Sequence, residues 1–247
     1  MTRAVLITGA AGGIGTALAA SFASCGDEVM LLDKDESAVK SAAQALQEHG
    51  GRARPYVCDI TDGRELEHLR ARWRNERIRP AVLINNAGIE VRAETGSSDF
   101  LERWRKVMAV NLDAAAFLTQ LLIDDLAETR GSVVNIASIQ SYAVLHTANT
   151  AYAVSKAAIA QLTRAMAVEY APRGVRVNAV APGVVETPMI RLSGQDPARF
   201  SRFIDRIPMA RFAEPREIAA PVRFLASEEA SYVTGAVLPV DGGFLAM

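Results

Sequence analysis

A tyrosine and a lysine four residues apart offer acid/base chemistry in the segment Tyr152-Ala-Val-Ser-Lys156. On the helix that this region predicts, positions i and i+4 share a face, so the phenol and the ammonium point the same way. A free tyrosine has a pKa of about 10, and lowering it by ~3 units takes ~4 kcal/mol of differential stabilisation of the phenolate. The lysine ammonium and a bound cationic ring are the expected sources. Such a pair also occurs by chance, but Ser138, after an apolar run, precedes it by 14 residues.

A glycine-rich turn near the N-terminus offers a second kind of chemistry. It follows an apolar run and opens a helical periodicity, so its backbone can approach a pyrophosphate and the helix N-terminus can stabilise the charge. The spacing departs from the G-x-G-x-x-G pattern, and glycines mark any tight turn, so the turn alone is a moderate signal. The binding residues expected in it are Gly9, Gly12, Gly13, Ile14 and Gly15.

Asp33 ends the second apolar run, 18 residues after Gly15. At that position a carboxylate meets the adenosine ribose of a bound dinucleotide, where it accepts hydrogen bonds from both hydroxyls and repels a 2′-phosphate. Asp33 therefore favours NAD over NADP. Lys34 could instead pair with a phosphate, whereas Gly12 brings no side-chain cation from the turn. The alternative is that Asp33 only caps the following helix.

The elements that must position these groups alternate along the chain as short apolar runs and helical periodicities. Several runs are nearly continuous in Val, Ile and Leu, which is typical of strands buried on both faces of a parallel sheet. This rhythm predicts an α/β fold, a doubly wound parallel sheet of about seven strands flanked by helices, as a single domain over residues 1–247. The runs are Ala4–Ile7, Val29–Leu32, Tyr56–Val57, Ala81–Ile84, Val133–Ile136, Val175–Val180 and Ala236–Val240.

Composition excludes several classes of protein. Half of the 247 residues are hydrophobic and 22% are charged, which excludes a disordered chain, and a net charge of −1 gives no drive toward nucleic acid or anionic membranes. Cys25, Cys58 and three scattered histidines form neither a disulfide framework nor a metal-ligand pattern. The glycines interrupt the apolar N-terminal stretch, so we expect strand, turn and helix there rather than a signal peptide, no membrane span, and a cytoplasmic protein.

One basic run, Arg70 to Arg79, contains Trp73. It could be a nucleic-acid patch with a stacking aromatic ring. The balanced net charge favours a solvated helix face whose arginines pair with Glu65, Glu67 and Glu76.

Taken together, these motifs resemble the short-chain dehydrogenase/reductase (SDR) family over essentially the whole chain. The resemblance implies a Rossmann-type fold and hydride transfer between a secondary alcohol and NAD, with NADP as the weaker choice. One departure is the interval from Ser138 to Tyr152, one residue longer than in many members. The matching features occur in the family's order: the glycine turn, Asp59, Asn85-Asn86-Ala87-Gly88, Asn111, Ser138, Tyr152, Lys156, Pro182-Gly183 and Asp241-Gly242-Gly243.

The resemblance also implies roles for single residues. Tyr152 would be the general acid/base, and Ser138 would hydrogen-bond the reacting oxygen. Lys156 would lower the tyrosine pKa and hold the nicotinamide ribose, and Asn111 would position a water in a proton relay. Asn111 could also be a helix-kinking residue and Ser138 a turn former. The further cofactor contacts implied are Asp59 and Ile60 at the adenine, Asn86, Ala87 and Gly88 at the adenosine ribose, and Pro182, Gly183, Val185 and Thr187 at the nicotinamide and phosphates.

Polar loop residues are expected at the mouth of the site, namely Glu90, Arg92, Gln140, His146 and Asn149. They suit a sugar, polyol or hydroxy acid better than a steroid, although Glu90 could simply pair with Arg92 and His146 could be a surface residue. A lid is expected over residues 186–210, whose arginines (Arg191, Arg199, Arg202 and Arg206) could meet an anionic substrate.

Two other functions stay open beside the alcohol dehydrogenase. One is a 3-oxoacyl-thioester (acyl-carrier-protein) reductase that uses NADPH, and the other is a catalytically silent binding protein of the same fold. The helices over Phe100–Leu126 and Ala151–Ala171 carry more apolar residues than one sheet-facing stripe requires. We therefore expect a homo-oligomer, a tetramer or a dimer.

Overall fold

Seven parallel strands form one sheet, in the order β3-β2-β1-β4-β5-β6-β7. The computed structural model describes residues 2–145, 147–187 and 204–247. The strand order reverses between β1 and β4, and a sheet with such a reversal leaves a crevice at the carboxyl ends of its strands. The strands are β1 (Ala4–Thr8), β2 (Glu28–Asp33), β3 (Arg52–Val57), β4 (Pro80–Asn85), β5 (Ser132–Ile136), β6 (Arg176–Pro182) and β7 (Val237–Val240).

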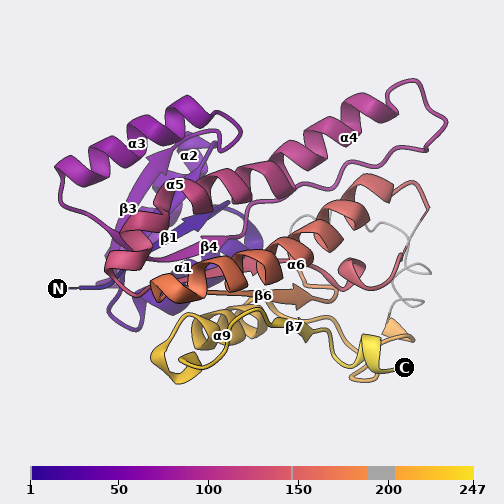
Figure 1. Ribbon diagram of the computed structural model, residues 1–247. Coiled ribbons are helices and arrows are strands. Elements are labelled where there is room, and N and C mark those ends of the chain that lie inside the picture. The colour runs from indigo at the N-terminus through magenta and orange to yellow at the C-terminus, as the bar shows by residue number, and fades with distance from the viewer. Residues whose placement is uncertain (1, 146, 188–203) are drawn as a thin grey trace.

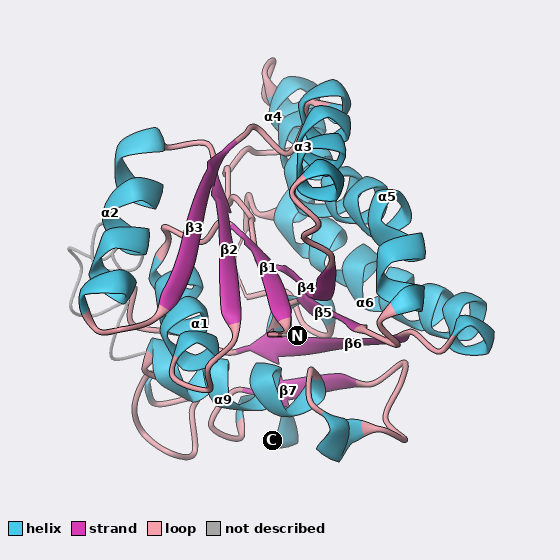
Figure 2. Cartoon of the chain, turned by 90° about the vertical axis from the view of Figure 1, so that its left-hand side faces the viewer, coloured by secondary structure: helices cyan, strands magenta, loops and turns pink. Residues whose placement is uncertain are grey.

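Helices cover both faces of the sheet (Figure 2). One layer holds α1 (Gly13–Ala23), α2 (Glu36–Glu48) and α9 (Pro215–Leu225), and the other holds α3 (Gly63–Asn75), α5 (Ala114–Glu128) and α6 (Thr150–Tyr170). Alternate side chains of each strand serve opposite layers: Val5 packs under the first layer and Leu6 under the second. Figure 1 shows α4 (Phe100–Met108) continuing into α5, which it does through a π-helical turn, Ala109–Asp113.

Each apolar run of the sequence contributes to a strand, so the doubly wound parallel sheet is confirmed. The third strand begins at Arg52, ahead of the predicted run. It is an edge strand paired only with β2, and only Ala53 and Tyr56 in it are buried. Half of such a strand faces solvent, so its first residues carry no continuous apolar signal.

The first part of the basic run, residues 70–75, lies on α3, where Trp73 is fully buried and packs edge-on against Tyr56 with ring centroids 5.5 Å apart. A buried ring cannot stack on a nucleotide. Arg72 pairs with Glu76 as expected, but Arg70 and Arg74 reach across to Asp125 of α5. The run therefore connects α3 with α5. Asp125 lies too far along the chain to be inferred as a partner from helical spacing.

The helical rod Phe100–Glu128 is long and apolar enough to cross a membrane by length and composition alone, with a mean hydropathy of 1.4 over its most apolar window. In the structure 44% of that window is buried, and the core helix of a soluble protein passes the same test. The rod packs on α3, α6 and the sheet, which accounts for its apolar character.

Candidate active site

A cleft of about 1070 Å³ lies along the carboxyl ends of the strands. It runs from the glycine turn after β1, past the ends of β2 and β3, to the segments that follow β5 and β6. Every cofactor contact expected from the sequence lines it: Gly9, Gly12, Gly13, Ile14, Gly15, Asp33, Asp59, Ile60, Asn86, Ala87, Gly88, Tyr152, Lys156, Pro182, Gly183, Val185 and Thr187.

The glycine turn has the features of a pyrophosphate cradle. Gly12 is the N-cap of α1 and supplies no side-chain cap, so the first N–H groups of that helix face the cleft without one. Gly9 has φ +62°, and a Cβ on it would lie 2.8 Å from the Cα of Ala87. Asn86 Nδ2 donates to the carbonyl oxygens of Thr8 and Gly9, at 2.9 and 3.0 Å, and so fixes the turn.

At the adenosine end, the Asp33 carboxylate accepts hydrogen bonds from the backbone N–H groups of Ala11 and Asp35, at 3.1 and 3.2 Å. The cap of α2 is Asp35, whose side chain accepts from the N–H of Ala38 at 2.9 Å. Asp33 is therefore not the helix cap. It lines the cleft instead, held against the glycine turn.

The catalytic triplet expected from the sequence comes together at the other end. Tyr152 and Lys156 lie on α6, with the lysine Nζ 5.7 Å from the centroid of the phenol ring. Lys156 is buried, and its Nζ donates a 2.7 Å hydrogen bond to the carbonyl oxygen of Ile136. Ser138 Oγ accepts a hydrogen bond from the N–H of Gln140, and all three side chains line the cleft.

The pKa of Tyr152 is raised, to about 12, which is opposite to the direction expected from the sequence. Burial of the phenol is the largest cause, the charge of Glu90 adds to it, and hydrogen bonding with Ser138 works against it. Burial also lowers the pKa of Lys156, to about 8. The expectation also counted the charge of a bound nicotinamide, and helical spacing reveals neither the desolvation of both groups nor the carboxylate of Glu90.

Asn111 lies in the π-helical turn between α4 and α5 and is buried. Its Oδ1 accepts from the N–H of Ile89 at 2.8 Å, and its Nδ2 donates to the Ile89 carbonyl oxygen and to Ser155 Oγ, each at 3.0 Å. The residue thus ties the loop after β4 to α6. A Cβ on Gly88 would lie 3.5 Å from Asn111 Oδ1 and 3.4 Å from Lys156 Nζ, so both side chains lie against the same glycine.

Three of the polar residues expected at the mouth, Glu90, Arg92 and Gln140, line the cleft. Arg92 Nε donates to Glu90 Oε1 at 3.0 Å, the pair that the sequence left open. Asn149 is instead buried behind Gln140 and donates to its Oε1 at 3.2 Å.

His146, Arg191, Arg199 and Arg202 lie outside the described residues, as does most of the expected lid. Arg206 is described, and its guanidinium stacks over the Phe244 ring at 4.6 Å.

Some lining residues carry no signal in the sequence. Lys106 of α4 adds a cation to the lining, and Phe212 and Leu145 add apolar surface. They reach the cleft only because distant elements fold over it. Among the residues that the structure describes, no group of three or more His, Cys, Asp or Glu side chains could hold a metal ion.

Comparison with known proteins agrees with this geometry. A family model described as "Enoyl-(Acyl carrier protein) reductase" matches residues 9–245. The chain belongs to the short-chain dehydrogenase/reductase family. It is 40% identical to galactitol 2-dehydrogenase (L-tagatose-forming) of Cereibacter sphaeroides, over 96% of this chain and 93% of that one. It is 36% identical to the 3-oxoacyl-[acyl-carrier-protein] reductase FabG of Thermotoga maritima, over 98% of both chains.

Among solved structures, a putative NAD(P)-dependent gluconate 5-dehydrogenase from Beutenbergia cavernae, crystallised with NADP at low occupancy, superimposes with a TM-score of 0.92. It is 40% identical in sequence, and the match covers 99% of this chain and 97% of that chain. The SDR family uses NAD(P), and the glycine turn, Asp33 and Lys156 line one cleft.

Proposed function

We propose that this protein is an oxidoreductase of the SDR family that transfers a hydride between a polar secondary alcohol and NAD. The observation that carries the proposal is the convergence of Ser138, Tyr152 and Lys156 on the cleft that also contains the glycine turn. A binding protein of this fold would have no need of that triplet, so its presence also counts against a catalytically silent member.

The protein side chains position the alcohol and move its proton. Ser138 holds the reacting oxygen. The Tyr152 phenolate accepts the alcohol proton in oxidation, and the neutral phenol returns it in reduction. Lys156, anchored on Ile136, supplies positive charge beside the phenol. A bound nicotinamide supplies the hydride acceptor and a second positive charge, which offsets the burial that raises the pKa of Tyr152.

We infer the substrate class from the charged and polar side chains that line the cleft along with Tyr152. Glu90, Arg92, Lys106 and Gln140 line it together. Glu90 and Gln140 can accept hydrogen bonds from hydroxyl groups, and Arg92 and Lys106 can pair with a carboxylate. We infer a polyol or a sugar acid, in agreement with the galactitol and gluconate named for two similar proteins.

NAD is the proposed cofactor because Asp33 lines the cleft beside the glycine turn, where its carboxylate would accept hydrogen bonds from the adenosine ribose. A similar protein was crystallised with NADP, so the proposed preference for NAD rests on this chain's own carboxylate. An NADPH-dependent 3-oxoacyl-thioester reductase is the second candidate, favoured by the similarity to the Thermotoga reductase.

A panel of polyols, sugar acids and a 3-oxoacyl thioester, each assayed with both cofactors, tests the proposal. We expect turnover of a polyol or sugar acid with NAD, and at least a tenfold loss of kcat in Tyr152→Phe, equivalent to about 1.4 kcal/mol of barrier. NADH binding by the variant should remain, since the ring stays in place. A wild-type protein that reduces only the thioester, or a variant that keeps its turnover, would overturn the proposal.

A further inference from the structure

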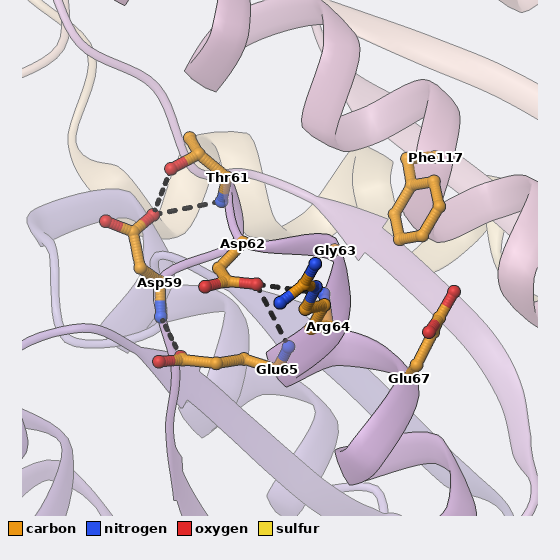
Figure 3. Close-up of a pocket in the computed structure, with 8 residues that line it drawn as sticks. All are labelled: Asp59, Thr61, Asp62, Gly63, Arg64, Glu65, Glu67 and Phe117. Carbon is orange, nitrogen blue, oxygen red and sulfur yellow. Dashed lines mark hydrogen bonds between the residues drawn. The ribbon is translucent and has the colours of Figure 1, made fainter.

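Asn149 occupies the N-cap position of α6 but does not cap the helix with its side chain. Asparagine is among the commonest N-cap residues, because its side-chain oxygen accepts a hydrogen bond from an N–H group of the first turn. Asn149 makes no such bond, and it is only 1% exposed. Asp62 of α3 shows the usual arrangement, since its Oδ1 accepts from the N–H groups of Arg64 and Glu65 at 2.9 and 3.2 Å (Figure 3).

The Asn149 side chain instead contacts the wall of the cleft. Its Nδ2 donates to Gln140 Oε1 at 3.2 Å, both side chains are buried, and Gln140 lines the cleft. The other polar atom, Asn149 Oδ1, is buried and has no partner in the part of the chain that the structure describes. Burying a polar atom without a partner costs stability. The fold accepts this cost at a residue whose side chain holds Gln140.

The backbone ahead of Asn149 is also constrained. Ala148 has φ +59°, a left-handed conformation that is uncommon for a residue with a Cβ. Its carbonyl oxygen accepts a hydrogen bond from the N–H of Ala93 at 2.9 Å, so the loop after β4 holds this turn. Such conformations persist where the surrounding structure fixes them. The position of Asn149 is therefore fixed by the turn before it and by α6 after it.

Gln140 is tied to Ser138 as well. Its N–H donates to Ser138 Oγ at 3.1 Å, at the start of a short 3₁₀ turn, Ile139–Ser141. Its side-chain Nε2 has no hydrogen-bond partner among the described residues, and its Oε1 keeps one lone pair beside the bond from Asn149. An amide held in this way loses little conformational freedom when it binds a substrate, so more of its hydrogen-bond energy contributes to affinity.

We propose that Asn149 is a positioning residue for substrate binding, which holds the Gln140 amide so that its nitrogen donates to a substrate oxygen. The proposal rests on the proposed function and deepens it. Gln140 then favours substrates that carry an oxygen besides the reacting one, as polyols and sugar acids do. Asn149 acts through Gln140 and does not itself touch the substrate.

Steady-state kinetics of wild type, Asn149→Leu, Gln140→Met and the double variant test the proposal, with NAD and either galactitol or gluconate. The leucine side chain keeps the branched shape of asparagine without its polar atoms, and methionine keeps the length of glutamine without its amide. We expect Asn149→Leu to raise KM for the alcohol roughly three- to tenfold, as for the loss of one neutral hydrogen bond, with kcat changed less than about twofold.

In the Gln140→Met background, Asn149→Leu should leave KM unchanged, because no amide remains to be held. An unchanged KM for Asn149→Leu alone, or an equal rise in both backgrounds, would contradict the proposal. Asn149→Ala, which leaves space instead of filling it, repeats the comparison if leucine is not accommodated.

Asp62→Ala is the control for the loss of a polar side chain at a helix start. It removes a side-chain cap from α3, so Tm should fall by roughly 2–4 °C while KM stays at the wild-type value. Asn149→Leu removes no cap and eliminates an unpartnered oxygen, so its Tm should stay near that of wild type. A Tm that falls as in Asp62→Ala, together with a lower kcat in both backgrounds, would show that Asn149 has a structural role only.

A crystal structure of Asn149→Leu separates this proposal from the proposed function, since it needs no turnover. The Gln140 side chain should leave the position that it has in wild type, and an unmoved Gln140 would contradict the proposal. Failure of wild type to oxidise galactitol, gluconate or any other alcohol removes the proposed reaction. The position of Gln140 in the variant then still decides whether Asn149 holds it.

Discussion

Lys156 donates its 2.7 Å hydrogen bond to the carbonyl oxygen of Ile136 at the end of β5, while its Nζ lies 5.7 Å from the centroid of the Tyr152 ring. The ammonium is thus anchored on the sheet, beside the phenol it is expected to assist. Burial is the cause of the lowered pKa of Lys156, so the fold holds this charge against a desolvation cost.

The first prediction concerns stability. Burial lowers the pKa of Lys156 from 10.5 to about 8, so between these values the unfolded chain binds more protons than the folded one. The free energy of unfolding contributed by this group therefore rises with pH across that window, by up to about 3 kcal/mol. Lys156→Met lacks the contribution. In urea denaturation between pH 8 and pH 10, we expect the free energy of unfolding of wild type to rise relative to that of Lys156→Met.

Lys40→Met is the matched control, because Lys40 is exposed on α2 and pairs with Glu36 one turn away. Its difference from wild type should stay nearly constant over the same pH window. A constant difference for Lys156→Met as well would show that the folded protein does not lower the proton affinity of this lysine.

Glu90 provides the second prediction. Its charge is the second cause, after burial, of the raised pKa of Tyr152. Removing the charge in Glu90→Gln lowers that pKa and also frees Arg92 from its ion pair. The base form of Tyr152 is then populated at lower pH. The acidic limb of the kcat/KM profile for alcohol oxidation should move to lower pH by a few tenths of a unit, as expected across a partly solvated cleft.

Glu94→Gln, on the exposed part of the same loop, should leave the profile in place. A profile for Glu90→Gln that coincides with wild type would mean that solvent screens Glu90 from the phenol. A shift to higher pH would contradict the sign of the interaction.

The sequence predicted those features that leave a local pattern. Buried strands such as β1 and β6 are apolar along most of their length, and the glycine turn and the Tyr152–Lys156 spacing follow from backbone geometry. Three features left no such pattern. The π-helical turn at Asn111 depends on contacts with Ile89 and Ser155, Lys106 reaches the cleft from another helix, and the pKa of Tyr152 depends on burial by the whole fold.

The third prediction is self-association. Much of the apolar excess of α5 is used within the chain, since Leu118, Leu122 and Leu126 are buried in the core. Val168 on α6 and Tyr232 after α9 remain exposed, at 79% and 103%. We expect a dimer or tetramer by light scattering at micromolar concentration, and these two side chains are candidates for the contact.

Two substitutions that introduce a negative charge locate the contact. Val168→Glu tests the α6 face, and Leu101→Glu tests α4, where Leu101 is 60% exposed. Only the substitution that lies inside the contact should lower the mass of the assembly measured by light scattering. A mass of one chain, 26.5 kDa, for the wild type would contradict the prediction.

The last prediction is cofactor choice, and it depends on Asp33. Its carboxylate accepts from the N–H groups of Ala11 and Asp35, so its position beside the glycine turn is fixed before any ligand binds. Hydrogen bonds from two ribose hydroxyls to such a charged acceptor contribute roughly 1.5–3 kcal/mol each, and a 2′-phosphate replaces one of them with repulsion. Asp33→Ser should therefore lower kcat/KM with NAD by at least about tenfold and raise relative use of NADP. The α2 cap should survive, because Asp35 supplies it. Comparing kcat/KM for both cofactors in wild type and variant decides the point. Equal or better efficiency with NADP in the wild type would mean that Lys34, not Asp33, dominates recognition of the ribose.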